Sequence, residues 1–478
     1  MIRIYFDWSV FSSLKKPEFS DLKTFLKSNK DALLCPYTPI HFNDLMKSFN
    51  DSNELIFHDL QTIEEISGNR FLDILDNNFY LREYSVQEYF EFRKNEIQSS
   101  SFEIIKDSLE ILEKEGIQLE ELSNEFKSLS LQNFGITEEN REAMSLFIPS
   151  LKSRNPSAKT ILLEFVAFAD KFNHDKSFYK EFRQNIKDKG LNLPQDSGNW
   201  KPEEVIEKLD QYLARFQGGI TYQKYVEQIC SFNPNMSLGR FEFYTNAYLL
   251  LDLIGFKQDK LSKNTDSLQN ILNDSHHSFY AAYCDFFVVQ DKILRLKTEA
   301  LFSFLKIKTE VVSPDELLMK INSRILREND YSGLGYIKLL KNGILVNKEA
   351  SKSVEEPDVY VYTLNNFIFN YFNYAVLYIY NFEKLNVLII EFKRYNRNYS
   401  SFIFEMEMQV LFSNVLEAYK LKGQSSFESL GTSFINKDIE NAKIVYQSHD
   451  HQMNFEINPD SLLPELSITM KVTKDEFN

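Results

Sequence analysis

Short apolar runs alternate with helical patterns at the start of the chain. Apart from Arg3, residues 2–6 are apolar, β-branched or aromatic, and the run ends at Asp7, a pattern that predicts a buried strand. Helical spacing follows over 22–26, and a second short strand is predicted over 33–35 before Pro36. Thr38 then precedes a helix that contains Asp44. The order strand, helix, strand, helix predicts a parallel α/β sheet.

The pattern changes from about residue 81 to residue 230. Long charged and apolar segments with helical periodicity follow one another, glycines are few, and no alternating run indicates a strand. This stretch predicts a helical block.

After Pro234 the α/β pattern returns. Asn273 and Asp274 end a polar stretch, so Asp274 is expected to open a helix, and Asp291 stands just past an apolar strand. The predicted elements are a helix over 244–254 closed by Gly255, a helix around 278–283, a strand over 286–289, a helix over 292–305 and a strand over 309–312. The pattern predicts one α/β unit split by a helical insertion.

A third region begins beyond Ser313. Its predicted elements are strands over 359–364, 376–380, 387–392 and 444–447 and an amphipathic helix over 405–421, which together indicate an α+β domain. The predicted domains are the α/β unit in two parts, 1–80 and 236–315, the helical insertion, 81–235, and the C-terminal α+β domain, 316–478.

Composition limits the classes of function. The net charge of −15 argues against a protein that coats nucleic acid non-specifically, because such binding depends on Lys and Arg neutralising phosphates. The three cysteines, Cys35, Cys230 and Cys284, are widely separated and fit a reducing compartment better than a disulfide framework or a zinc site. With no secretory signal and no apolar run of about 20 residues, we expect a soluble cytoplasmic protein without a membrane span.

Four aspartates occupy positions that a parallel sheet is expected to bring together at one edge. Asp7 follows the first strand, Asp44 lies in the second helix, and Asp274 and Asp291 flank the later strand. The carboxyl ends of parallel strands share one edge, so residues far apart in sequence can meet there. Close carboxylates repel by on the order of 4 kcal/mol per pair. A divalent cation such as Mg²⁺ or Mn²⁺, which prefers oxygen ligands, removes that cost.

The segment from Asn273 to Lys292 resembles the late half of PIN-domain nucleases, in which an acid, an alanine-bearing helix, an apolar strand and a further Asp follow one another. The opening 4–7 is similar to that family's first strand and acid, and 36–44 to its second acid segment. The resemblance covers about 1–68 and 241–315, and Val289 replaces the Thr that often precedes the last acid.

The resemblance implies a PIN-like three-layer α/β/α sandwich and an endoribonuclease that hydrolyses RNA. It also implies a Mg²⁺ or Mn²⁺ site formed by Asp7, Asp44, Asp274 and Asp291. A role in RNA decay or phage defence follows from fold analogy alone.

Each of these residues also has a structural interpretation. Asp7, Asp274 and Asp291 are typical helix N-caps, and Asp285 is typical of a turn before a strand. Glu64 or Glu65 is an alternative second acid to Asp44. His41, His276 and His277 are more typical of hydrogen-bonded structural residues than of catalysts, although a His beside acids can orient water.

A basic, aromatic stretch over 393–399 is the candidate surface for single-stranded nucleic acid. Lys393, Arg394 and Arg397 are its proposed substrate contacts, with a solvated charged surface as the alternative interpretation. Three alternatives for the whole protein stay open: a PIN-fold sensor or adaptor with weak catalysis, a nuclease acting on single-stranded DNA, and a helical scaffold without the first strand. The C-terminal domain is expected to regulate, dimerise or select substrate.

Overall fold

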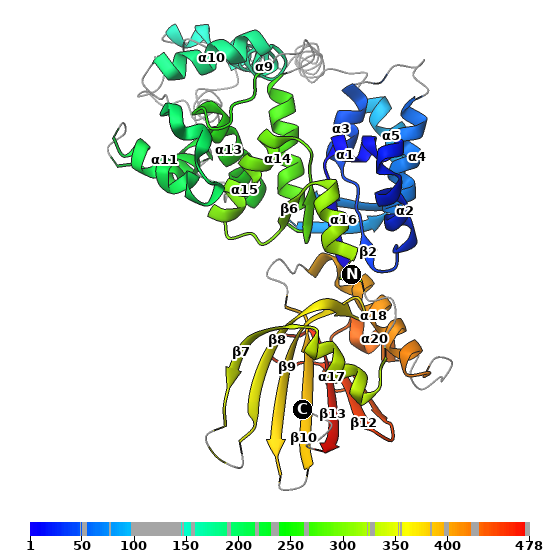
Figure 1. Ribbon diagram of the computed structural model, residues 1–478. Helices are drawn as coiled ribbons and strands as arrows, with labels where there is room; N and C mark the ends of the chain where they lie inside the picture. The colour runs from blue at the N-terminus through cyan, green and yellow to red at the C-terminus, as the bar shows by residue number, and fades with distance from the viewer. Residues whose placement is uncertain are drawn as a thin grey trace.

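The chain is described from a computed structural model (Figure 1). The structure describes residues 1–478 except 48, 50–54, 76–77, 97–144, 146–147, 154–157, 189–192, 216–218, 231–238, 262–266, 323, 326–329, 352, 354–355, 383–384, 396–400, 422–429 and 474–478. The protein is mixed α/β, with a parallel sheet and a separate antiparallel sheet.

The parallel sheet joins the two ends of the predicted α/β unit. Its strands are β2 (Leu33–Leu34), β1 (Ile2–Phe6), β5 (Phe286–Val288) and β6 (Glu310–Val312), in that order. Phe6 lies opposite Val288, and all the pairings in this sheet are parallel. The strands predicted for the two parts of the α/β unit are therefore confirmed, and β1 and β5 end at the same edge.

Side chains of the parallel sheet alternate between two hydrophobic cores. Ile4 and Phe6 pack into one core with Phe286, whereas Tyr5 and Phe287 pack into the other. Both faces of the sheet are buried, which is why its strands are mostly apolar. In Figure 1 the early helices (blue) and the late helices (green) lie to either side of this region.

The early helices, together with the late helix α16 (Pro314–Asn322), pack into one core, and most of the other late helices pack into the other. The early helices are α1 (Trp8–Ser13), α2 (Ser20–Ser28), α3 (Pro39–Lys47), α4 (Leu55–Ser67) and α5 (Val86–Glu96). The late helices are α13 (Arg240–Leu253), α14 (Leu268–Ala281), α15 (Lys292–Phe304) and α16 (Pro314–Asn322), the last of which packs on β5 and β6.

The region between these segments is mainly helical where it is described. Its helices are α9 (Ala158–His174), α10 (Lys176–Asp188), α11 (Val205–Leu213) and α12 (Tyr222–Cys230). Residues 97–144 of the predicted insertion lie outside the described residues. Ahead of it, β3 (Arg70–Leu75) and β4 (Asn78–Glu83) form an antiparallel pair that the sequence pattern did not predict.

A seven-stranded antiparallel sheet dominates the C-terminal region, in the order β11-β12-β13-β10-β9-β8-β7. Its strands are β7 (Ile344–Glu349), β8 (Asp358–Ile368), β9 (Phe372–Asn381), β10 (Leu385–Lys393), β11 (Lys443–Gln447), β12 (His451–Ile457) and β13 (Pro464–Thr473). The helices here are α17 (Gly333–Lys341), α18 (Phe404–Ala418) and α20 (Leu430–Ile435). The predicted strands and helix are present, but β7, β12 and β13 were not predicted.

Buried ion pairs join this sheet to the parallel one. The Arg3 guanidinium lies 3.1 Å from one Asp285 oxygen, and that of Arg394 lies 3.7 Å from the other. Arg394 also donates to the Tyr371 carbonyl oxygen at 2.9 Å. Separately, none of the helices described here has both the length and the apolar character to cross a bilayer.

Candidate metal centre

Asp7 uses one carboxylate oxygen to start a helix. It is the N-cap of α1, where Oδ2 accepts hydrogen bonds from the Ser9 backbone N–H at 3.2 Å and from the Ser9 hydroxyl. Its Oδ1 has no hydrogen-bond partner among the described residues. Burial raises the pKa of Asp7 and the negative charge of Asp44 adds to this, although His277 and Ser9 act in the opposite direction.

Asp291 repeats this arrangement beside the neighbouring strand. It is the N-cap of α15, and its Oδ1 accepts from the backbone N–H groups of Ile293 at 2.6 Å and Leu294 at 2.9 Å. Its Oδ2 has no partner within the part of the chain that the structure describes. The Asp7 backbone N–H donates to the Val288 carbonyl at 3.0 Å, so both aspartates follow paired strand ends. Capping and a role in a site are therefore compatible.

Asp44 is held by three donors. Its Oδ1 accepts from Asn273 Nδ2 and from Lys47 Nζ, both at 2.7 Å, and its Oδ2 lies 3.0 Å from His277 Nε2. These contacts outweigh the effect of burial, so the hydrogen bond and charge of His277, with Lys47, leave the pKa of Asp44 well below its usual range. Asp44 is ionised and fixed beside α14.

A buried hydrogen-bond chain connects Asp44 to the first strand. The Tyr5 hydroxyl lies 2.9 Å from His277 Nδ1 and 2.8 Å from the Thr38 hydroxyl. His41 continues the chain from Thr38 at 2.9 Å to the Phe6 carbonyl, also at 2.9 Å. Burial lowers the pKa of His41 to about 3, so it is neutral. His41 and His277 are structural residues here, which agrees with their more typical interpretation.

Asp274 lies inside a helix and not at its start, which differs from the prediction made from the sequence. It does not open a helix, because α14 begins at Leu268 and Asp274 lies in its second turn. Its carboxylate has no hydrogen-bond or ion-pair partner among the described residues. Burial raises the pKa of Asp274 well above its usual range, and the negative charges of Asp259, Asp7, Asp44 and Asp291 raise it further. The charges of the other three predicted aspartates thus all act on the Asp274 carboxyl group.

Asp259 was missed by the sequence analysis. It follows α13 in a polar turn, and its Oδ2 accepts a 2.8 Å hydrogen bond from the buried Lys297. Among the charges acting on Asp274 it is the strongest. Nothing in its sequence neighbourhood, Lys257-Gln258-Asp259-Lys260, distinguishes it from an ordinary surface turn.

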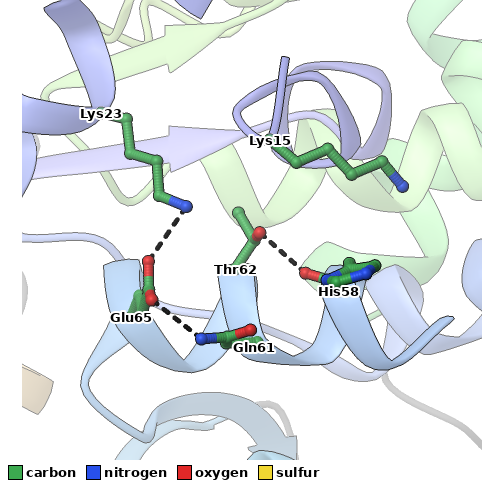
Figure 2. Close-up of a pocket in the computed structure, with 6 residues that line it drawn as sticks. All are labelled: Lys15, Lys23, His58, Gln61, Thr62 and Glu65. Carbon is green, nitrogen blue, oxygen red and sulfur yellow. Dashed lines mark hydrogen bonds and ion pairs between the residues drawn. The ribbon is translucent and has the colours of Figure 1, made fainter. Parts of the chain in front are cut away.

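The alternative acids, Glu64 and Glu65, have other surroundings. Glu65 on α4 pairs with Lys23 at 3.0 Å and with Lys27 at 3.4 Å, and Glu64 is exposed. Figure 2 shows Glu65 bound by Lys23 and Gln61 at the wall of a surface pocket of about 360 Å³. Neither glutamate is among the groups that raise the pKa of Asp274. Of these three acids, only Asp44 is among the groups that raise the pKa of Asp274.

Asp285 and the proposed substrate contacts have other surroundings. Both Asp285 oxygens contact Arg3, which, despite burial, keeps the pKa of Asp285 well below its usual range. Arg394 is buried against the Phe367 and Tyr371 rings, so it is not a surface contact for substrate as we expected. Lys393 pairs with Glu391 at 2.7 Å and with Glu465 at 3.4 Å. Arg397 lies outside the described residues.

A divalent cation fits the chemistry of the acid group. Asp274 and one oxygen each of Asp7 and Asp291 supply hard oxygen donors without competing partners among the described residues. Among the described residues, however, no group of three or more His, Cys, Asp or Glu side chains is arranged so that it could hold a metal ion. Mg²⁺ is commonly held by one or two carboxylates and several waters, so it does not require such a set.

Comparison with protein-family models, with curated proteins and with solved structures gave no match for this chain.

Proposed function

We propose that this chain is a PIN-type, metal-dependent endoribonuclease with its catalytic centre at Asp7, Asp44, Asp274 and Asp291. One observation carries the proposal: the Asp274 carboxylate has no partner among the described residues while four other carboxylates raise its pKa. Carboxylates that act on one another in this way carry a repulsion that a hard cation removes. The strand order β2-β1-β5-β6, which joins late strands directly to the first, supports a PIN-like fold.

Different residues of the chain would have different roles at such a centre. Asp274 and the uncapped oxygens of Asp7 and Asp291 would hold Mg²⁺ or Mn²⁺, and Asp44 would hold its waters or coordinate it directly. A bound divalent ion of this kind polarises the phosphodiester and acidifies a bound water. His277 and Asn273 fix Asp44 by donating to it. Lys47, whose side chain is 35% exposed, places a cation beside Asp44 where it can meet a phosphate.

RNA is the proposed substrate because of the resemblance over 273–292. The direct test incubates end-labelled single-stranded and structured RNAs with the full chain in Mg²⁺, Mn²⁺ or EDTA. Asp274→Asn and Asp7→Asn should slow cleavage by more than about 100-fold, since even outer-shell partners of metal ligands commonly contribute 10–100-fold. Glu64→Gln and Glu65→Gln, which alter the alternative acids, should leave the rate unchanged.

DNA of the same sequence, assayed in parallel, separates an RNA nuclease from one that cuts single-stranded DNA. Cleavage that survives both aspartate substitutions, or that proceeds in EDTA, would reject the proposed centre.

A sensor or adaptor module of the same fold is the second candidate. The observation that favours it is that both Asp44 oxygens already have donors, since they accept from Asn273, Lys47 and His277. Val289 in place of the family's usual Thr points the same way. RNA binding by the wild-type chain in Mg²⁺ without any cleavage would favour this candidate.

A further inference from the structure

The C-terminal region contains a small apolar pocket between α17 and strands β8 and β9, with a volume of about 220 Å³. Ile337 and Leu340 of α17 form one wall, and Tyr360 and Tyr362 of β8, with two apolar residues of β9, form the other. Figure 1 shows α17 lying against this sheet. Sites for drug-sized ligands begin at roughly 300 Å³, so this pocket is too small for a nucleotide or a large cofactor.

Two lysines border this pocket. Lys341, the last residue of α17, lines it directly. Lys348 of the edge strand β7 pairs with Tyr360, and its Nζ lies 5.0 Å from the centre of that ring. Both lysines are exposed, and neither has an ion-pair partner among the described residues. The pocket therefore combines an apolar interior with positive charge at its rim.

The carboxylates along this edge of the sheet form no ion pair with these lysines. Asp358 pairs with Ile379, which lines the pocket, so it lies on the same face of the sheet. Its oxygens accept from the Ser351 backbone N–H at 2.8 Å and from the Asn381 amide at 3.2 Å. Glu349 is the next residue after the lysine of β7, and successive residues of a strand point to opposite faces. The positive charge at the rim is thus available to a ligand.

We propose that this pocket binds a small amphipathic anion, a molecule with one carboxylate or similar head group and an unbranched apolar tail. The tail would lie between α17 and the sheet, and the head group would meet Lys341 and Lys348 at the rim. Because a group of the size of a water molecule occupies about 30 Å³, the pocket holds about seven such groups, which corresponds to a tail of about seven carbons. The proposal is independent of the metal centre and gives the C-terminal region a ligand of its own.

Calorimetric titration of the full chain with straight-chain carboxylates, from butanoate to dodecanoate, tests the fit of the tail. Affinity should rise about tenfold for every two carbons added, because each buried methylene leaves water. The rise should stop near octanoate, when the pocket is full. Octylammonium tests the head group: it should bind at least about tenfold more weakly than octanoate, since its charge repels the two lysines. The neutral octanol should bind with intermediate affinity.

Variants of the rim and of the wall locate the site. Lys341→Met and Lys348→Met each remove one exposed cation, so they should fold normally, weaken octanoate binding about threefold to fivefold and leave octanol binding unchanged. Lys471→Met is the matched control and should bind like the wild type, because Lys471 is exposed on β13, which β10, β9 and β8 separate from β7. Tyr362→Ala enlarges the pocket and should move the limit of the rise to longer tails.

Several results would overturn the proposal. A chain that binds no octanoate has no such site. Affinity that keeps rising to dodecanoate, or equal binding of octanoate and octylammonium, would mean unspecific adsorption of apolar tails. Octanoate binding that both rim substitutions leave unchanged would lie elsewhere on the protein. None of these results bears on the proposed nuclease centre, which the cleavage assays test separately.

Discussion

At the scale of single residues, the sequence presented helix capping and metal binding by Asp7 and Asp291 as alternatives, whereas the geometry of each residue is compatible with both. Each caps a helix with one oxygen, as its position after a strand indicates, and each leaves its other oxygen without a partner among the described residues. The sequence could identify these residues because strand ends and caps have local signatures. It could not identify Asp259, whose importance depends on Lys297, 38 positions later in the chain.

Substitution of Asp291 separates its capping of α15 from its proposed metal binding. Asn is as good an N-cap as Asp, whereas Ala costs typically about 1 kcal/mol of stability. Asp291→Asn should therefore keep the free energy of unfolding within a few tenths of a kcal/mol of the wild-type value but lose Mg²⁺-dependent cleavage. Asp291→Ala should lose cleavage and also about 1 kcal/mol of the free energy of unfolding. Urea denaturation and the RNA assay measure the two effects. Full cleavage by Asp291→Asn would leave Asp291 as a cap alone.

The raised pKa of Asp274 predicts how the metal-free protein responds to pH. Between the ordinary aspartate pKa of about 3.9 and the raised folded value, the folded chain holds a proton that the unfolded chain has released. Stability in EDTA should consequently fall as pH rises above about 4. Asp274→Asn removes this contribution. The melting temperature of the variant minus that of the wild type should therefore increase as pH rises. Melting curves that stay parallel across pH would contradict the raised pKa.

At the scale of elements, α14 organises the site. It carries Asn273 and His277, which bind Asp44, as well as Asp274 itself. The sequence located this helix but placed its start too late, because Asn273-Asp274-Ser275 resembles an N-cap while Leu268 and Ile271 extend the buried stripe one turn earlier. Strands β12 and β13 alternate between buried and partly exposed residues, a period of two that could have revealed them from sequence.

The Tyr5 hydroxyl links this helix to the first strand, and its removal should be measurable. Tyr5→Phe removes the partner of His277 Nδ1 and one of the two partners of the Thr38 hydroxyl, which should cost about 1–3 kcal/mol in the free energy of unfolding. Cleavage should fall far less than in Asp274→Asn, because no proposed metal ligand is removed. Unchanged stability in urea would show that the chain from Phe6 to Asp44 contributes nothing to the fold.

At the scale of the whole molecule, residues about 280 positions apart form one sheet edge, since Phe6 pairs with Val288. The sequence predicted this convergence only through the general rule for parallel strands; the strand order itself depends on packing of the complete α/β unit. The contact between the two sheets was not predicted, because the cations over 393–394 resemble a surface patch. In the fold, Arg394 is buried against Asp285 and Tyr371.

Arg394 should therefore couple the stability of the two sheets. Arg394→Met leaves the Tyr371 carbonyl without this donor, at a cost of about 1–3 kcal/mol, and removes a charge that faces Asp285. Calorimetry should show a lower melting temperature, or two transitions where the wild type has one. Lys393→Met, at the adjacent and partly exposed position, is the matched control and should melt like the wild type. Equal effects of the two substitutions would contradict this coupling.

The central claim is that aspartates from the early and the late segments of the chain surround a divalent ion at one edge of the parallel sheet, and a crystal of the full chain soaked in Mn²⁺ tests it most directly. We predict an anomalous difference peak in contact with Asp274 and with at least one of Asp7 and Asp291, absent from crystals of Asp274→Asn. A soaked wild-type crystal with no peak at these carboxylates, or one in which Asp274 instead binds a protein donor, would contradict the account.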